Sequence, residues 1–252
     1  MYDDDYLAHY GILGMKWGVR KDREKPTNKT KQTIGDTDRI IKSGTKITNV
    51  TDRKFKEGYN NRIYASHTDY DKASYVDIVS SWGDTGNAYV NTFSVKKDIR
   101  IPSDKKVVDV FSSLVKENPK AVAKDMAMAY KARVGLPLKS EKHFSKKIQS
   151  LNNGDIKTGK KLYKQYNNML VVDMKSSQNF YAKLAAEGYS ALSDTHDRGS
   201  VSLDPLIIFK PEGSLSKVES LKLTTEDIKN YNKQVVNTNF RKARKTFNEA
   251  HK

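Results

Sequence analysis

The sequence predicts an α+β fold, a small mixed or antiparallel sheet with several flanking helices, preceded by a flexible N-terminal segment. Short alternating stretches and longer stretches with helical spacing follow one another in mixed order along the 252 residues. The apolar fraction of 37% is low for a globular protein but too high for a disordered chain. We therefore expect a segment over residues 1–37 and one α+β domain over residues 38–252.

Four short strands are predicted in the first half of the chain, over residues 45–50, 62–66, 88–95 and 99–101. In the third of them, Tyr89, Phe93 and Val95 alternate onto one face. A helix over residues 70–82 separates the second and third strands, and Asp69 can cap it.

A helical insertion is expected around residues 103–170. Apolar side chains recur with helical spacing from Val107 to Val115, and Asn118 with Pro119 ends that helix and begins another. Residues 135–165 are lysine-rich and contain several glycines and prolines, so we expect loops with one or two short helices there.

The last third returns to mixed structure. A helix over residues 177–187, ended by Gly188, leads to a short strand at 189–194. The continuous apolar run 206–209 predicts a buried central strand, and residues 218–223 predict another strand. Thr224 and Asp227 resemble a capping box that starts one long final helix.

The chain is strongly basic, with 46 Lys and Arg against 30 Asp and Glu. The excess lies in runs at residues 16–31, 139–164 and 229–252. Such runs can bind nucleic-acid phosphates or can form a solvated surface, and composition does not choose between them. No apolar run is long enough to span a membrane and no secretory signal is visible, so we expect a soluble protein that is cytoplasmic at synthesis.

Several kinds of functional site are excluded or weakly indicated. There is no cysteine, which excludes disulfides, thiolate metal sites and a cysteine nucleophile. No histidine has metal-ligand spacing with another, so no metal site is predicted. Asp194, His196 and Asp197 form a local acidic–histidine cluster, for which a surface loop is the simpler interpretation.

A peptide near the N-terminus stands out because its glycines are too frequent for a good helix or strand. Its large side chains suit docking into a partner, with basic residues at the rim. The residues that define it are His9, Tyr10, Gly11, Gly14, Met15, Lys16, Trp17, Gly18 and Arg20.

This peptide resembles one, HYGxxGMKWGxR, that recurs near the ends of proteins from tailed bacteriophages and prophages, commonly around the head genes. The resemblance implies a phage origin and does not itself give the peptide a role. From the side chains of the peptide we infer a virion protein that binds the capsid or another head protein through residues 7–20. The protein would then be a minor head component or a packaged effector.

A second feature runs from Arg62 to Tyr75 and predicts a strand, a turn and a helix. It resembles the second NAD-contacting element of ADP-ribosyltransferases of the diphtheria-toxin and poly-ADP-ribose-polymerase type. The resemblance implies an NAD site in which two tyrosines hold the nicotinamide ring, and a late-strand carboxylate, here Asp204, is catalytic. The NAD-contacting residues would be Gly44, Thr45, Tyr64, Ser66 and Tyr75.

Two positions depart from that family. Ser43 stands where the family has histidine, and Asp204 followed by Pro205 stands where it has glutamate. Four interpretations stay open. The domain can be an active transferase that modifies a host protein or nucleic acid, a transferase-like fold kept for binding, an ordinary strand–turn–helix with core tyrosines, or a nucleic-acid-binding accessory protein.

Overall fold

The computed structural model describes residues 37–54, 62–82, 85–134, 140–152, 156–170, 174–199, 201–238 and 240–250. In these ranges the chain is a mixed α+β fold with small antiparallel sheets, which confirms the predicted class. The predicted docking peptide lies outside the described residues.

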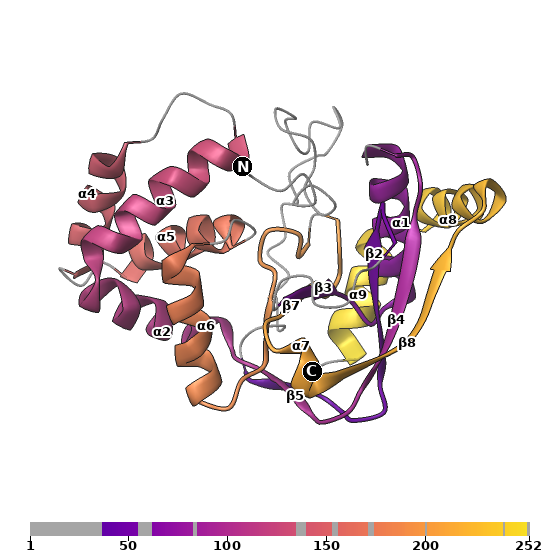
Figure 1. Cartoon of the computed structure of the whole chain (residues 1–252), viewed down its shortest axis with the longest axis horizontal. Coiled ribbons are helices and arrows are strands. Elements are labelled where there is room, and N and C mark those ends of the chain that lie inside the picture. The colour runs from indigo at the N-terminus through magenta and orange to yellow at the C-terminus, as the bar shows by residue number, and fades with distance from the viewer. Residues whose placement is uncertain are drawn as a thin grey trace.

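A helical lobe stands beside the strands in Figure 1. It is one long excursion of the chain between β5 (Ile99–Ile101) and β6 (Ala191–Ser193). Its helices are α2 (Asp104–Glu117), α3 (Pro119–Val134), α4 (Glu141–Asn152), α5 (Ile156–Met169) and α6 (Lys175–Ala186). The Ser190 amide donates to the Arg100 carbonyl at 3.1 Å, so the excursion begins and ends at nearly one place.

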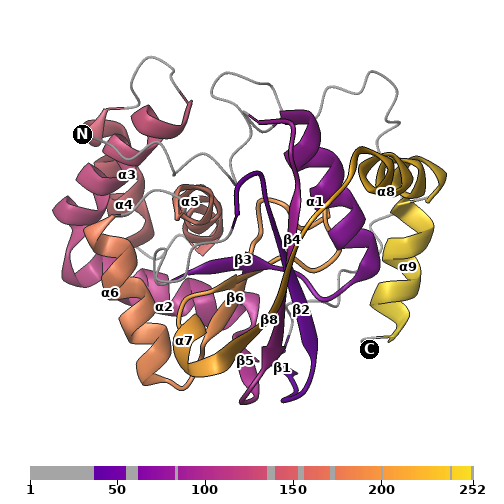
Figure 2. The same ribbon diagram turned by 45° about the vertical axis from the view of Figure 1, so that its right-hand side comes forward.

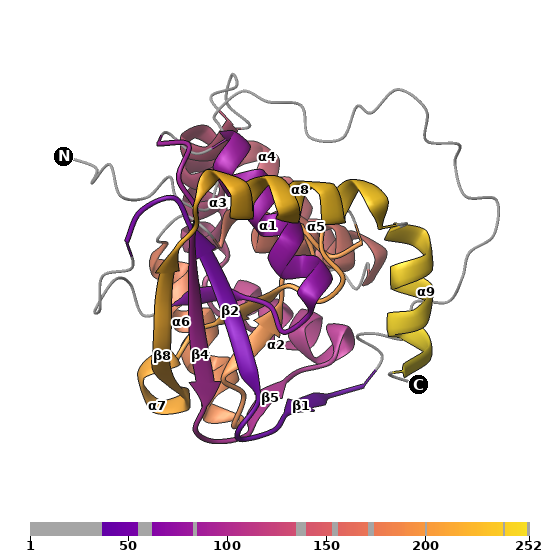
Figure 3. The ribbon, with the colours of Figure 1, turned by 90° about the vertical axis from the view of Figure 1, so that its right-hand side faces the viewer.

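The first sheet has the order β2-β4-β8, with every pair antiparallel. Its strands are β2 (Lys46–Thr51), β4 (Tyr89–Val95) and β8 (Leu215–Lys222). The helices α1 (Asp69–Trp82) and α8 (Thr225–Asn237) lie side by side against it (Figures 2 and 3). Val50 and Val90 of the sheet pack there with Val76 and Val79 of α1.

The second sheet has the order β3-β7-β6 and is also antiparallel, formed by β3 (Ile63–Ala65), β7 (Leu206–Ile208) and β6. One face packs against the first sheet and the β1 (Arg39–Ile41) and β5 pair through Ile63, Ala65, Ala191, Leu206 and Ile208. The other face packs against the helical lobe through Tyr64, Leu192 and Ile207. The fold is therefore layered: helical lobe, second sheet, first sheet, then α1 and α8.

The two sheets meet at one corner. The backbones of Thr48 and Ser66 exchange two hydrogen bonds, of 2.7 and 2.9 Å. Next to them, the Asn49 side chain donates to the Tyr64 carbonyl at 2.8 Å, and the buried Asn91 donates to the Asn49 side chain. These bonds satisfy polar groups that burial would otherwise leave unpaired.

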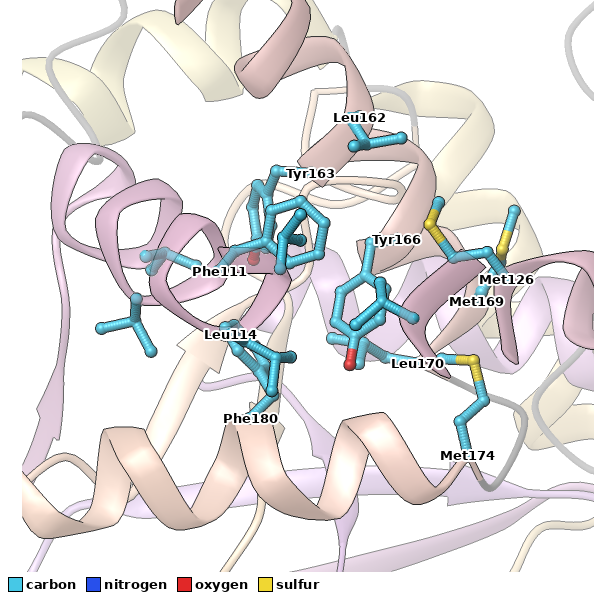
Figure 4. Close-up of a cluster of buried hydrophobic side chains, with 14 of the residues drawn as sticks. Phe111, Leu114, Met126, Leu162, Tyr163, Tyr166, Met169, Leu170, Met174 and Phe180 are labelled. Carbon is cyan, nitrogen blue, oxygen red and sulfur yellow. The ribbon is translucent and has the colours of Figure 1, made fainter. Parts of the chain in front are cut away.

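The helical lobe has an aromatic core, shown in Figure 4. Phe111 is fully buried, and its ring lies 4.7 Å from that of Tyr166 and 5.7 Å from that of Tyr163. Phe180 of α6 meets the Phe111 ring edge-on. Tilted and edge-on arrangements are the ones that aromatic quadrupoles favour. The core thus fixes α2, α5 and α6 together.

Most predicted elements are confirmed with small shifts of their ends, but some differ from the prediction. Residues 141–152 and 156–169 form full helices rather than mainly loops, because Phe144, Ile148 and Leu151 give α4 a buried stripe among its lysines. Thr68, not Asp69, caps α1, since its hydroxyl accepts the Asp71 amide proton. The strand β1 was not predicted.

The final helix is two helices rather than one. The predicted capping box is confirmed, because Thr224 accepts the Asp227 amide and Asp227 accepts the Thr224 amide. At the other end, α8 stops at Thr238, whose backbone is extended, and α9 (Phe240–Ala250) follows in a new direction (Figure 3). Asn and Thr side chains compete with helical hydrogen bonds, which favours a break at Asn237–Thr238.

Tyr189 provides a test of how the helical lobe is joined to the first strand. Its hydroxyl donates to Asp38 at 2.6 Å, and burial, reinforced by this carboxylate, raises the pKa of Tyr189 to about 12. The neutral phenol is thus favoured in the folded state, so its stabilisation is complete below pH 10 and is lost between pH 10 and 12.

We expect the free energy of unfolding of the wild type to fall more steeply over that pH range than that of Tyr189→Phe, which has no phenol to ionise. Denaturant titrations of both proteins across the range measure this. Parallel pH curves would contradict the assignment.

Candidate functional site

Asp204, the predicted catalytic residue, is fully buried and paired with Arg39 of β1. The guanidinium makes two hydrogen bonds to the carboxylate, Nη1 to Oδ2 at 2.6 Å and Nη2 to Oδ1 at 2.8 Å. The second nitrogen also donates to the Ser193 hydroxyl at 2.9 Å. This two-pronged geometry is the strongest form of Arg–carboxylate contact.

His67 also approaches the Asp204 carboxylate. Its Nδ1 lies 3.7 Å from Asp204 Oδ2. The register explains the approach, since Ala65 opposes Leu206 in the β3–β7 pair, and two residues further along each strand His67 opposes Asp204. We call Arg39, His67, Ser193 and Asp204 the Asp204 cluster.

Asp71, in the first turn of α1, holds the backbone that leads into Asp204. Its two carboxylate oxygens accept the amides of Leu203 at 2.6 Å and Asp204 at 3.0 Å. Burial raises the pKa of Asp71, while these two amide donors act against the rise. These two hydrogen bonds join α1 to the segment that precedes β7, next to the Asp204 cluster.

Tyr64 and Ser66 lie on the opposite face of the second sheet from the Asp204 cluster. Tyr64 is paired with Ile207 and packs against the helical lobe. Ser66 follows Tyr64 by two residues and is buried, and its hydroxyl makes no hydrogen bond to the part of the chain that the structure describes. Alternation in a strand sends Tyr64 and Ser66 one way and Ala65 and His67 the other.

Gly44 and Thr45 lie in the turn that joins β1 to β2. Gly44 has φ +86°, a left-handed conformation that favours glycine, and its amide donates to Val95 at 2.8 Å. Thr45 is three residues along the strand from Thr48, the residue that meets Ser66, a distance of about 10 Å. Both residues thus shape a turn at the far end of the first sheet.

Tyr75 is on α1, as predicted, and its hydroxyl donates to Asp197 at 2.9 Å. Burial raises the pKa of Tyr75 well above its usual value, and the neighbouring Asp197 adds to the rise. Its ring packs at the edge of the core between α1 and the first sheet. The contact fastens the loop around Asp197 to α1.

Of the six predicted transferase residues, the structure therefore brings Tyr64 and Ser66 near one another. Asp204 lies on the opposite face of the second sheet. The residues that do surround Asp204 were not predicted: Arg39, His67, Asp71 and Ser193. For His67 alone the sequence contained a clue. Side chains alternate along a strand, so His67, three residues after Tyr64, is expected on the face opposite that tyrosine. Arg39 belongs to a strand whose three residues carry no usable period.

The predicted NAD-site residues are spread over both faces of the second sheet, the β1–β2 turn and α1. A nicotinamide held by Tyr64 would lie on the face of the sheet toward the helical lobe, and the Asp204 carboxylate is on the other face, bound to Arg39. NAD as a substrate stays a prediction. Within the described ranges, no group of three or more His, Asp or Glu side chains is placed to hold a metal ion.

Comparison with known proteins concerns the N-terminal segment. A family of unknown function, DUF7211, matches residues 2–24. The matched stretch contains the whole glycine-spaced peptide and ends before Thr37, where the described structure begins. Searches of curated proteins and of solved structures found no match to the chain. None of the helices in the described ranges has the length and apolar character needed to cross a membrane.

The Arg39–Asp204 pair yields a stability prediction. Arg39→Met removes the bidentate partner of a carboxylate with no exposed surface and leaves His67 at 3.7 Å from it, and we expect a loss of about 3–5 kcal/mol in the free energy of unfolding. The double variant Arg39→Met/Asp204→Leu removes both charges and should recover most of this loss. Chemical denaturation of the variants and the wild type measures both effects.

The matched control is Lys42→Met, which breaks the neighbouring pair with Asp98. Both of its members are solvent-exposed, so little change is expected. Equal losses in the single and double variants would show that the pair is not the source of the effect.

Proposed function

We propose that this is a virion-associated bacteriophage protein, in which the N-terminal peptide docks to a head protein and the α+β domain is carried as cargo. In this proposal the domain enters the virion with the peptide and reaches the host bacterial cytoplasm. The domain itself is proposed to be ADP-ribosyltransferase-like.

The observation that carries the proposal is the separation of the two parts of the chain. The family match ends at residue 24, while the described domain begins at residue 37. A peptide matched without the domain behind it has the character of a portable docking signal. Its aromatic and methionine side chains are of the kind that supply most of the energy at interfaces.

The net charge supports the cargo role. With 46 basic against 30 acidic residues, the chain carries a formal charge of +16. Inside a filled capsid the phosphate concentration is high, and release of counterions favours basic proteins there.

The docking signal can be tested apart from the domain. Residues 1–37 fused to a fluorescent protein, produced in the host during infection by the phage that encodes the chain, should be recovered in purified particles. Trp17→Ala and Tyr10→Ala should each lower incorporation about tenfold or more, because such side chains anchor interfaces.

Lys31→Ala, outside the peptide, is the control and should incorporate normally. Particles that exclude the wild-type fusion but contain the full chain would contradict docking through the peptide.

ADP-ribosyl transfer is the second candidate function. The observation in its favour is that the strand of Tyr64 pairs directly with the strand that follows Asp204. The departures at Ser43 and Asp204, and the placement of Tyr64 and Asp204 on opposite faces, weigh against a competent site. A fold kept for binding is the version that these observations favour.

Incubation with labelled NAD, host lysate and DNA distinguishes the two versions. If the domain only binds, neither nicotinamide release nor label transfer should exceed that of the Tyr64→Ala variant. Label transfer that Tyr64→Ala and Asp204→Asn both abolish would establish an active transferase. Circular dichroism of each variant checks that a lost signal does not reflect unfolding.

A further inference from the structure

The C-terminal helix α9 lies over the edge of the Asp204 cluster. The ring of Phe247 is 6.3 Å from that of His67, and the ring of Phe240 is 5.3 Å from that of Tyr70. His67 is thus near both Asp204 and Phe247.

A third contact fixes the middle of the helix. Gly199 has φ +79°, and the Arg244 guanidinium lies so close to it that an added Cβ would be 3.3 Å from the guanidinium. Phe240, Arg244 and Phe247 are four and three residues apart, a spacing that puts them on one face of a helix. This face is the one that α9 presents to the domain.

The attachment of α9 is nevertheless light. Among the α9 side chains that the structure describes, Phe240, Ala243, Arg244 and Phe247 are only partly buried, and the rest are exposed. By contrast, α2 buries Val107, Val110, Phe111, Leu114 and Val115. An element with little buried apolar surface opens at a low free-energy cost.

The sequence of α9 is basic. Residues 240–250 hold Arg241, Lys242, Arg244 and Lys245 against the single acid Glu249. Repeated positive charge on a short helix suits a ligand with regularly spaced negative charges, and a nucleic-acid backbone has that chemistry.

We propose that α9 reversibly covers the Asp204 cluster and that duplex DNA, by binding to α9, displaces it from the cluster. In the closed form the Arg244 guanidinium lies against Gly199, so it can reach a phosphate group only when α9 lifts off, and DNA therefore binds the open form more tightly. A ligand that binds the open form more tightly shifts the population toward it. The inference needs neither virion association nor transferase activity.

The test measures how fast diethyl pyrocarbonate modifies His67 in the full chain, followed by mass spectrometry of its peptide. His143, in α4 of the helical lobe, is the internal reference. A short mixed-sequence DNA duplex should raise the rate at His67 and leave the rate at His143 unchanged.

Two variants test separately whether α9 covers His67 and whether its lysines bind DNA. Phe240→Ala/Phe247→Ala removes both ring contacts, and we expect His67 to react about three- to tenfold faster without DNA. Lys242→Gln/Lys245→Gln should keep His67 protected and lose most of the response to DNA. Thr246→Ala, at an exposed position of α9, is the control and should behave as the wild type.

Three results would overturn the proposal. DNA that binds the full chain, as seen in a mobility-shift assay, but leaves or lowers the rate at His67 would show that α9 is not displaced. An unchanged rate in the double phenylalanine variant would show that α9 does not cover His67. A full DNA response in the double lysine variant would place the DNA elsewhere.

Discussion

The ion pair between Arg39 and Asp204 is the constraint on which the layered arrangement depends. It joins the first strand of the described domain to Asp204, two residues before the central strand of the second sheet and 165 positions later in the chain. A carboxylate with no solvent exposure is costly unless it is paired, so the pair holds β1, β6 and β7 in one relative position. Asp71 adds a second tie by accepting the amides just before β7.

Around that pair, polar bonds join segments that hydrophobic packing alone would leave free to slide. Asn49 and Asn91 connect the two sheets at their corner, and Tyr189 connects the end of the helical lobe to Asp38. Each bond is directional and joins residues far apart in sequence. Apolar clusters supply most of the stabilisation, whereas these bonds select one arrangement of the layers.

Much of the fold could be predicted from sequence because period and caps are local properties. The stripe of α2, the capping box of α8 and the buried run of β7 were all visible in this way. The short strand β1 was not, because three residues give no period. The helices α4 and α5 were underestimated, since their lysines obscured a narrow apolar stripe. The break before α9 reflects the contacts of Phe240 and Phe247 with distant residues. The Asp204 cluster shares this limit, because its members meet only through strand register.

The closeness of Arg100 and Ser190 has a consequence for the history and assembly of the domain. A chain segment whose two ends touch can be gained or lost without rethreading the strands, and its helices can form from local contacts before the sheets pair. Loss of this segment would nevertheless cost free energy. Leu192, Ile207 and Phe209 belong to the same apolar core as Phe111 and Tyr166. A shortened protein would expose that face of the second sheet to water, so another body of similar size would have to replace the helical lobe.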